Sequence, residues 1–283
     1  MFHLDPKKIF WKKKIDGGTF GEVYPYKDPD GKNSVVKKIK ADSIKSLFKS
    51  FQEVVLGFSC HHPAIISTSG YCIEHLPSNE RSDEFNVYIR MPRMMQNLQN
   101  FIEENIKENR KLSLEEIVKK LHTLASGIEY LHGRKIAHRD IKPRNILMDS
   151  EENVLLSDIG SAVFVPEDEH SLTIGIVEGT LKYMAPEILK KYGKVKKKMF
   201  YKGDVWSLGL SIAQLCLMEF QDATKNHEKK IDEIIKRIQD NYGEPLASII
   251  KGMLRIDQNE RTHIKDVLKG LEEHFEDILL GKK

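Results

Sequence analysis

Short runs of β-favouring residues alternate with turn signals over residues 9–40 of the chain. The pattern is interrupted at 17–18, where two glycines occur, and at 28–31, where the sequence is Asp-Pro-Asp-Gly. Glycine, proline and aspartate at such points favour reversal of the chain between strands. The pattern therefore predicts three strands in an antiparallel sheet.

Residues 43–59 have the spacing of an amphipathic helix. Apolar side chains recur there at intervals of three and four residues, at Ile44, Leu47, Phe48, Phe51, Val55 and Phe58. Such spacing places them along one side of a helix, so we predict a helix that buries this face. After a polar stretch at 77–86, the alternating apolar residues Val87, Ile89 and Met91 predict a further strand.

Beyond residue 96 the periodicity is that of helices. The predicted helical segments are 98–105, 113–132, 201–220, 231–239 and 246–254. Ser113 followed by Glu116 has the spacing of a capping box, in which each residue satisfies a backbone N–H of the other at the start of a helix. The chain has neither a fixed-period repeat nor a low-complexity linker.

These elements predict an α+β fold in which the chain, 1–283, forms a single domain of two lobes. The first lobe, about 9–91, is a small antiparallel sheet plus one helix. A short hinge at 92–95 leads to a larger, mostly helical lobe at about 96–280. We expect the two lobes to pack around a cleft, which is where ligands usually bind.

Composition excludes several classes of protein. A chain of 283 residues that is 40% hydrophobic, with a net charge of +3, can bury a substantial core and is not disordered. Its three cysteines, Cys60, Cys72 and Cys216, fit neither a disulfide framework nor a zinc site, so a reducing cytoplasmic setting is expected. No apolar run approaches the roughly 18 residues that cross a bilayer, and we expect neither a transmembrane segment nor a signal peptide.

The segment from His138 to Asn145, His-Arg-Asp-Ile-Lys-Pro-Arg-Asn, carries the clearest chemistry. Asp140, Lys142 and Asn145 bring a carboxylate, a cation and an amide oxygen into one loop, groups that suit a hydroxyl nucleophile, a phosphoryl oxygen and a metal ion. Asp158 follows a short apolar strand and adds a second carboxylate suited to Mg²⁺.

At this point the sequence resembles the eukaryotic-type protein kinases, over nearly its whole length. The family pattern H-R-D-x-x-x-x-N is complete, and Asp158-Ile159-Gly160 matches D-F-G with Ile for Phe. The resemblance implies that Asp140 accepts or orients the proton of the substrate hydroxyl and that Lys142 steadies the transferred group. It also implies that Asn145 and Asp158 hold Mg²⁺, or Mn²⁺ in its place, with ATP.

The resemblance extends to the nucleotide site. Residues 15–23 resemble the glycine-rich loop over ATP, with Gly18 and Gly21 as its second and third glycines and Asp16 in place of the first. Strand alternation and the family's A-x-K spacing select Lys37 as the phosphate-binding lysine, with Lys38 as the alternative, and Glu53 as its partner. The residues implied for adenine are Val23, Val35, Met91, Arg93, Met94 and Leu147.

Further segments match the family. Residues 179–187 resemble the end of the activation segment, and 204–209 resemble the buried helix that supports the catalytic loop. Glu187 and Arg261 are expected to form a buried structural pair. Lys142 together with Thr180 is the serine/threonine pattern, which implies a protein substrate with a Ser or Thr acceptor. His132 and His138 are expected to be packed or backbone-bonded rather than metal ligands.

Two alternatives to an active protein kinase remain open. A pseudokinase would use the fold for binding alone, and Asp16, Ile159 and the small Gly57 are departures that favour it. Either Gly57 leaves its helix loosely braced, so that activity needs an activating partner, or Leu56 fills that position. A small-molecule kinase is the other alternative. The segment around Thr180 argues against it, because the family uses that segment to bind protein substrates.

Partners and regulation are read from two segments. Six lysines lie between Lys190 and Lys198. They form either a solvated loop or a site that binds an acidic substrate or an anionic surface. No nucleic acid partner is expected. Arg139 pairs in the family with a phosphate on the activation segment, and Ser171 and Thr173 are the candidate acceptors, with Glu178 as a fixed anion in their place.

Overall fold

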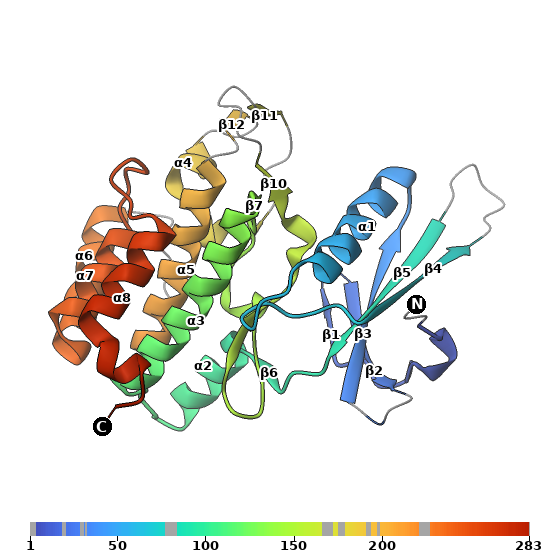
Figure 1. Ribbon diagram of the computed structural model, residues 1–283, viewed down its shortest axis with the longest axis horizontal. Coiled ribbons are helices and arrows are strands. Elements are labelled where there is room, and N and C mark those ends of the chain that lie inside the picture. The colour runs from blue at the N-terminus through green and yellow to red at the C-terminus, as the bar shows by residue number, and fades with distance from the viewer. Residues whose placement is uncertain are drawn as a thin grey trace. The chain divides into compact units, whose positions relative to one another are not determined.

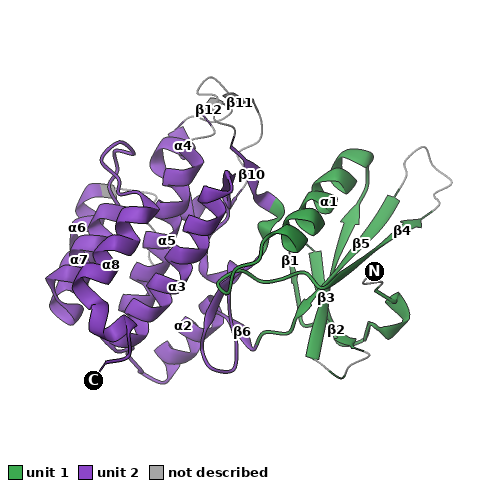
Figure 2. Ribbon diagram, viewed as in Figure 1, with its two compact units in different colours: residues 1–94, 158–160 green, residues 95–157, 161–283 purple. Residues whose placement is uncertain are grey.

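The protein is described by a computed structural model (Figure 1). The residues it describes are 4–18, 21–28, 31, 33–76, 84–165, 172–174, 179–190, 194–196, 199–220 and 227–282. The chain divides into two compact units, coloured separately in Figure 2. Unit 1 is Met1–Met94 with Asp158–Gly160, and unit 2 is Met95–Ser157 with Ser161–Lys283.

Unit 1 is built on a five-stranded antiparallel sheet in the order β1-β2-β3-β5-β4. Its strands are β1 (Asp16–Gly18), β2 (Gly21–Lys27), β3 (Asn33–Ala41), β4 (Gly70–Leu76) and β5 (Glu84–Pro92). The three strands predicted before residue 41 and the strand around Ile89 are confirmed. The structure adds β4, which the sequence did not predict because its alternation is weak and four of its seven residues are exposed.

Strand β5 lies between β3 and β4 and is covered on both sides. Val87, Tyr88 and Ile89 are all buried, although they point alternately to opposite faces of the sheet. On one face Val87 and Ile89 pack with Val54 of helix α1 (Ile44–Ser59). On the other face Tyr88 packs in a cluster with Leu4. Leu4 belongs to the N-terminal segment, which continues into the 3₁₀ turn Pro6–Lys8.

Helix α1 occurs where it was predicted, but the prediction of its buried face is wrong. Four of the six apolar residues that defined that face are exposed: Ile44 by 60%, Phe48 by 70%, Phe51 by 38% and Val55 by 48%. Leu47 and Phe58 do pack, partly buried, against the sheet cluster. The side that is buried carries Ser50, Glu53, Val54 and Gly57. A charged residue and a glycine, invisible to a hydrophobic pattern, therefore set the orientation of this helix.

Unit 2 is mostly helical. Its helices are α2 (Leu98–Lys107), α3 (Leu114–Gly133), α4 (Pro186–Lys190), α5 (Met199–Leu217), α6 (His227–Tyr242), α7 (Glu244–Met253) and α8 (Ile264–Leu279). The five predicted helices correspond to α2, α3, α5, α6 and α7. Helices α4 and α8 were not predicted. Helix α5 is buried along nearly its whole length, as a helix that is apolar on all sides should be, and packs on α3, α6 and α7.

Short strands and 3₁₀ turns join these helices. The small sheets are β6 (Gln96–Asn97) with β8 (Ile146–Met148) and β9 (Val154–Leu156), β7 (Ile136–Ala137) with β10 (Val163–Phe164), and β11 (Leu172–Ile174) with β12 (Lys194–Lys196). The 3₁₀ turns are Pro143–Asn145, Ile159–Ser161 and Leu181–Tyr183. In the part of the chain that is described, no helix is long and apolar enough to cross a membrane.

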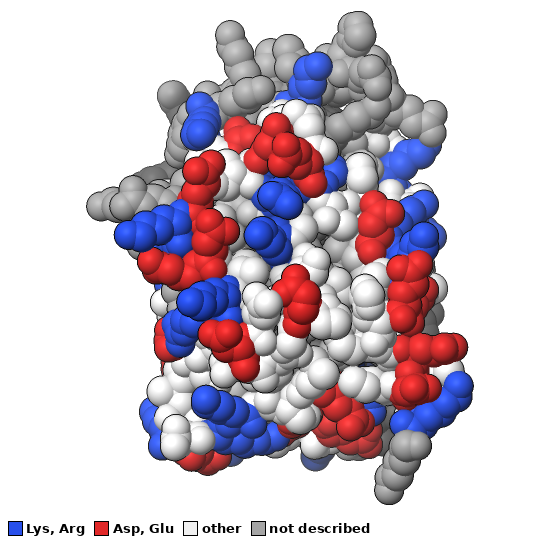
Figure 3. Space-filling model, turned by 90° about the vertical axis from the view of Figure 1, so that its left-hand side faces the viewer, with Lys and Arg blue, Asp and Glu red and all other residues white. Residues whose placement is uncertain are grey.

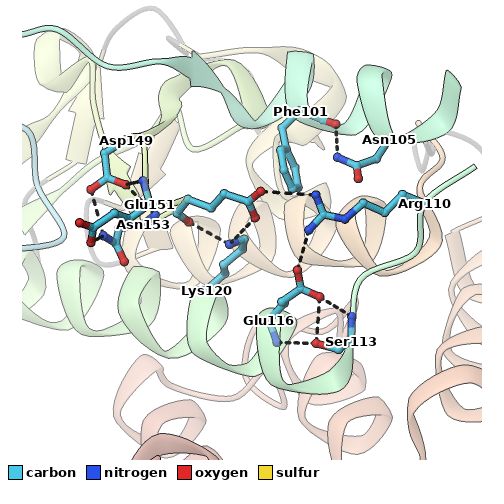
Figure 4. Close-up of polar contacts among 10 residues, drawn as sticks. Phe101, Asn105, Arg110, Ser113, Glu116, Lys120, Asp149, Glu151 and Asn153 are labelled. Carbon is cyan, nitrogen blue, oxygen red and sulfur yellow. Dashed lines mark hydrogen bonds and ion pairs between the residues drawn. The ribbon is translucent and has the colours of Figure 1, made fainter. Parts of the chain in front are cut away.

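The predicted capping box at the start of α3 is confirmed (Figure 4). Ser113 Oγ accepts from the backbone N–H of Glu116 at 3.2 Å, and the Glu116 carboxylate accepts from the N–H of Ser113 at 2.7 Å. Arg110 holds the same carboxylate at 2.8 Å. One turn further on, Lys120 Nζ donates to the backbone carbonyl of Glu152 at 2.8 Å. These contacts fix the start of the helix that leads to the loop at residue 138.

Ser113→Ala is expected to lower the free energy of unfolding by about 1 kcal/mol, because it leaves a helix N–H without its cap. Urea unfolding of the purified chain measures the change. Ser126→Ala is the matched control on the same helix, since within the described parts of the chain the Ser126 hydroxyl bonds only to the helix carbonyl of Thr123. Equal stability of the two variants would contradict the role of the cap.

Candidate functional site

The loop from His138 to Asn145 lies between strands β7 and β8 of unit 2 and encloses one carboxylate. Asp140 is only 3% exposed. Its Oδ2 accepts from Lys142 Nζ at 2.7 Å and from Asn145 Nδ2 at 2.8 Å, and its Oδ1 accepts from both the N–H and the hydroxyl of Thr180 at 3.0 Å. Lys142 Nζ also donates to Thr180 Oγ1 at 2.7 Å. Three predicted site residues, Lys142, Asn145 and Thr180, are thus in direct contact with a fourth, Asp140.

This loop is held from behind by a second carboxylate. Asp204, on α5, is 1% exposed. Its oxygens accept the backbone N–H groups of His138 and Arg139 at 2.9 and 2.8 Å, and His132 Nε2 at 2.9 Å. A carboxylate oxygen only accepts, so His132 carries its proton on Nε2. The expected supporting role of the 204–209 helix is confirmed.

The remaining structural expectations in unit 2 also hold. The His138 ring is fully buried and lies 3.1 Å from the carbonyl of Ser157. Arg261 forms two bonds to the Glu187 carboxylate, at 2.6 and 2.9 Å, and its guanidinium also stacks over Trp206. This buried ion pair ties the segment after Thr180 to the loop that precedes α8.

A second cluster of charge lies in unit 1. Lys37 Nζ on β3 bonds to Glu53 Oε1 on α1 and to Asp158 Oδ1, both at 2.8 Å. Burial alone would lower the pKa of Lys37, but the two carboxylates outweigh it and raise the pKa above its ordinary value. Burial, assisted by the charge of Asp158, raises the pKa of Glu53 against the opposing effect of Lys37. The lysine therefore stays charged between its two partners.

The two lysines of β3 point in opposite directions. Lys37 faces α1 and its acidic partner, whereas Lys38 lies over the rings of Trp11 and Tyr88, at 5.3 and 6.0 Å from their centroids. The expected pair of Lys37 with Glu53 is therefore the one that occurs, and Lys38 belongs to an aromatic cluster on the other face of the sheet.

The segment Asp158-Ile159-Gly160 reaches this cluster with an uncommon backbone. Asp158 has φ of 61°, a left-handed conformation that costs energy for a residue with a side chain and is often found at functional sites. A Cβ on Gly160 would lie 2.7 Å from Glu53 Oε2, so a larger residue there would displace the Glu53 carboxylate. Ile159, in place of the family's Phe, is buried. The departure at 159 is therefore accommodated by packing.

Gly57 was the most doubtful departure from the family pattern. A Cβ at this position would lie 2.0 Å from Thr68 Oγ1, and the carbonyl of Gly57 accepts from the N–H of Thr68 at 3.2 Å. Leu56, the alternative filler, is only half-buried. Gly57 therefore lets α1 approach the segment before β4 closely, one turn beyond Glu53. Sequence reasoning missed Thr68, because no spacing connects it to the helix.

The predicted glycine-rich segment forms a hairpin. Gly18 and Gly21 are register partners at the end of β1 and β2, and Val23 pairs with Asp16 on one side and with Lys37 on the other. The Asp16 carboxylate, exposed, accepts from the N–H of Gly17 at 2.7 Å. The departure at Asp16 thus supports the backbone beside it.

The residues implied for adenine are divided between the two units. In unit 1, Val35 is buried and pairs with Met91, and the N–H of Arg93 bonds to the carbonyl of Asn33 at 3.1 Å. Met94 ends unit 1 and is half-buried. In unit 2, Leu147 is half-buried on β8 and pairs with Leu155. Each unit therefore presents its own share of the set.

Only some of the residues implied for the activation segment lie in the described part of the chain. Thr180 contacts Asp140 as described above, and Thr173 lies on β11 with Val195 as its register partner. Ser171 and Glu178 lie outside the described residues. Arg139 was expected to meet a phosphate, and its guanidinium stacks over Phe200 at 4.6 Å. The sequence did not indicate this contact. Of the lysine run, Lys190 and 194–196 are described.

Metal-ligating side chains are not clustered in the described part of the chain. Among the described residues, no three His, Cys, Asp or Glu side chains are grouped as a metal site. The amide of Asn145 and the carboxylate of Asp158 are donors of the kind that Mg²⁺ takes together with substrate phosphates.

Comparison with known proteins agrees with this arrangement. The family described as the protein kinase domain matches residues 11–271. The rust resistance kinase Lr10 of Triticum aestivum is 32% identical over 72% of this chain, and a G-type lectin S-receptor-like serine/threonine-protein kinase of Arabidopsis thaliana is also 32% identical over 72%. The Aurora kinase of Yarrowia lipolytica is 28% identical over 91%. The chain spans 31%, 23% and 66% of these relatives.

Gly57→Ala is expected to lower the free energy of unfolding by about 1–3 kcal/mol, because the new Cβ overlaps Thr68 and forces α1 away. Urea unfolding tests this. Gly133→Ala, at a helix position with nothing within 4 Å, is the matched control and should change little. Adding Thr68→Ala to the first variant should restore part of the loss. Unchanged stability of Gly57→Ala would show that the close contact is not needed.

Proposed function

The chain belongs to the protein kinase family, and on that premise we propose that it is a serine/threonine protein kinase, which transfers the γ-phosphoryl group of ATP to a hydroxyl group of a protein. The observation that carries the proposal is the contact set of Asp140, Lys142 and Thr180. The same three groups would surround a serine or threonine hydroxyl and the phosphoryl group that it receives.

In unit 2, Asp140 orients the acceptor hydroxyl and takes its proton. Lys142, whose ammonium bonds to both Asp140 and Thr180, places positive charge where negative charge develops during transfer. Thr180 holds the carboxylate in position by two bonds to one oxygen. The substrate would enter with its hydroxyl in place of these internal contacts.

In unit 1, Lys37 binds the α- and β-phosphates of ATP, and Glu53 holds Lys37 in place. Gly18 and Gly21 let the hairpin backbone approach the triphosphate. Asp158 and Asn145 would hold Mg²⁺, or Mn²⁺ in its place, which neutralises phosphate charge when the nucleotide is bound. The residues implied for the base, described above in each unit, complete the nucleotide site.

The structure offers a physical account of each departure from the family pattern, which supports the proposal of an active enzyme over a pseudokinase. The three departures that favoured a pseudokinase are each accommodated, Asp16 by a backbone bond, Ile159 by burial and Gly57 by its contact with Thr68. An activating partner remains part of the proposal, because Gly57 leaves no side chain to brace α1 against the segment at 158–160. Autophosphorylation at Ser171 or Thr173 remains part of the proposal, as does a cytoplasmic setting.

Incubation of the chain with labelled ATP and Mg²⁺, alone and with a mixture of serine and threonine peptides, tests the proposal. Transfer of label to peptide or to the chain itself is the expected result. Asp140→Asn should reduce transfer at least about a hundredfold while leaving nucleotide affinity nearly unchanged, because it removes only the proton acceptor. Asp240→Asn, on α6, is the matched control. Unchanged turnover of Asp140→Asn would refute the role given to Asp140.

Lys37→Met is expected to silence transfer, whereas Lys38→Met should retain nearly all of it, because only Lys37 lies between two carboxylates. Lys37→Met should also lower the unfolding temperature, since it leaves buried carboxylates unpaired. Nucleotide affinity and thermal unfolding, measured on both variants, separate these effects. A silent Lys38→Met beside an active Lys37→Met would exchange the two assignments.

A further inference from the structure

The segment before strand β1 combines lysines with large apolar residues. Residues 7–14 read Lys-Lys-Ile-Phe-Trp-Lys-Lys-Lys, and the proposed function gives none of them a role. The segment lies beside β2 of unit 1, in dark blue in Figure 1. All of its residues except Ile9 are exposed. It is therefore a surface segment in which cations and aromatic rings are neighbours.

Ile9 fixes this segment to the sheet. Its side chain is buried in the cluster that also contains Leu4, and its backbone forms a bridge with Tyr26. The N–H of Phe10 donates to the carbonyl of Pro25 at 3.0 Å, and the carbonyl of Phe10 accepts from the N–H four residues into the turn, at 3.0 Å. Because the backbone is already held, a partner that binds the exposed side chains has little chain to order.

Two aromatic side chains next to Ile9 are in contact with solvent. Phe10 is 46% exposed and Trp11 is 42% exposed. The Trp11 ring packs edge-on against Tyr24 and Tyr88, with centroids 5.1 and 5.8 Å apart. The sheet thus supports the indole while much of it remains open. Adjacent exposed aromatic residues differ from the single apolar side chains that most surfaces carry, and they indicate a partner.

The lysines around these rings outnumber the acids. Residues 1–21 contain five lysines and two aspartates, and this excess of +3 equals the net charge of the whole chain. The two aspartates each accept a bond from a backbone N–H. Among the described residues, Lys14 is the one lysine of the five that forms an ion pair, with Glu22 at 2.8 Å. The other four are Lys7, Lys8, Lys12 and Lys13.

Two acids of the adjoining strands each have a lysine of β3 beside them. Glu22 on β2 bonds to Lys14 and lies near Lys40. Glu74 on β4 lies near Lys38. These strands therefore leave the positive excess of the segment in place. By contrast, the face of unit 2 that carries α6, α7 and α8 has acidic and basic side chains interspersed (Figure 3).

The residue types favour a lipid surface over a nucleic acid. All cations of residues 7–14 are lysines, whereas arginine is the side chain that recognises phosphates and base edges by paired bonds. Lysine acts as a point charge, which suits a layer of anionic headgroups. Tryptophan and phenylalanine enter the boundary between headgroups and acyl chains. Both properties match the surface of an anionic bilayer.

We propose that residues 7–14 bind the surface of an anionic phospholipid bilayer, with Phe10 and Trp11 in the headgroup boundary and the lysines against the lipid charge. Each lysine close to such a surface strengthens binding about fivefold, and the aromatic rings add apolar contact. Binding requires neither nucleotide nor phosphoryl transfer, so its test is independent of the proposed activity.

Sedimentation of the full chain with vesicles tests the proposal. One set is made of phosphatidylcholine and phosphatidylserine in equal parts, and the other of phosphatidylcholine alone. The chain should sediment with the anionic vesicles and not with the neutral ones, and added salt should weaken the binding because it screens the charges. Equal binding to both sets, or binding to neither, would overturn the proposal.

Lys12→Gln with Lys13→Gln should weaken binding to the anionic vesicles about twentyfold, since two lysines leave the surface. Lys265→Gln with Lys269→Gln, which removes two exposed lysines from α8, is the matched control and should bind as the wild type does. Thermal unfolding checks that both variants fold. Affinity that survives the change at 12 and 13 would assign vesicle binding to other lysines and refute the role of the segment.

Tryptophan emission separates insertion of the rings from attraction of charge alone. The chain has two tryptophans, and Trp206 is buried, so a change on adding vesicles reports on Trp11. Anionic vesicles should shift the emission to shorter wavelength, and lipids with brominated acyl chains should quench it. Unchanged emission would contradict the placement of Trp11. A single-stranded oligonucleotide that binds more tightly than the vesicles at the same salt concentration would assign the segment to nucleic acid instead.

Discussion

The carboxylate of Asp204 is buried in the helical core of unit 2, and it is stable there because three donors meet it. Two of the donors are consecutive backbone N–H groups, those of His138 and Arg139, at the start of the loop that carries the proposed chemistry. The loop is therefore held by its main chain, which leaves the side chains of Asp140, Lys142 and Asn145 available for the proposed chemistry. Holding the loop in this way has an energetic cost at Arg139. Its φ of 72° places it in the left-handed region, which residues with a side chain disfavour.

The same constraint, that a buried charge must be neutralised where it lies, organises unit 1. Lys37 is enclosed by Glu53 from the helix and Asp158 from a segment far along the chain. A lysine between two carboxylates keeps its proton and holds three separate segments together. Removing one member leaves an unpaired buried charge, which costs more than the pair contributes. The positions of these three side chains and the charge of Lys37 therefore depend on one another.

Sequence reasoning reached most of the site because the chemistry depends on residue type and local spacing. His138 to Asn145 is one short loop, so its geometry follows from its own sequence. It failed on helix α1, where the apolar spacing indicated the wrong face. The helix turns Glu53 toward Lys37 and Gly57 toward Thr68, and the contacts of a charge and of a missing side chain have no hydrophobic signature. Helix α8 was missed although its apolar side is buried.

The sequence by itself determined the order of most strands and helices, although not β4, α4 or α8. It also determined the identity of the acid, lysine and amide in the loop at 138–145 and the choice of Lys37 over Lys38, because each depends on neighbours in the chain. Only the tertiary structure decided which side of α1 is buried, that Thr68 limits residue 57 to glycine, and that Trp11 packs on Tyr24 and Tyr88. These depend on side chains far apart in sequence, whose distances are set by packing of the whole unit and not by any local pattern.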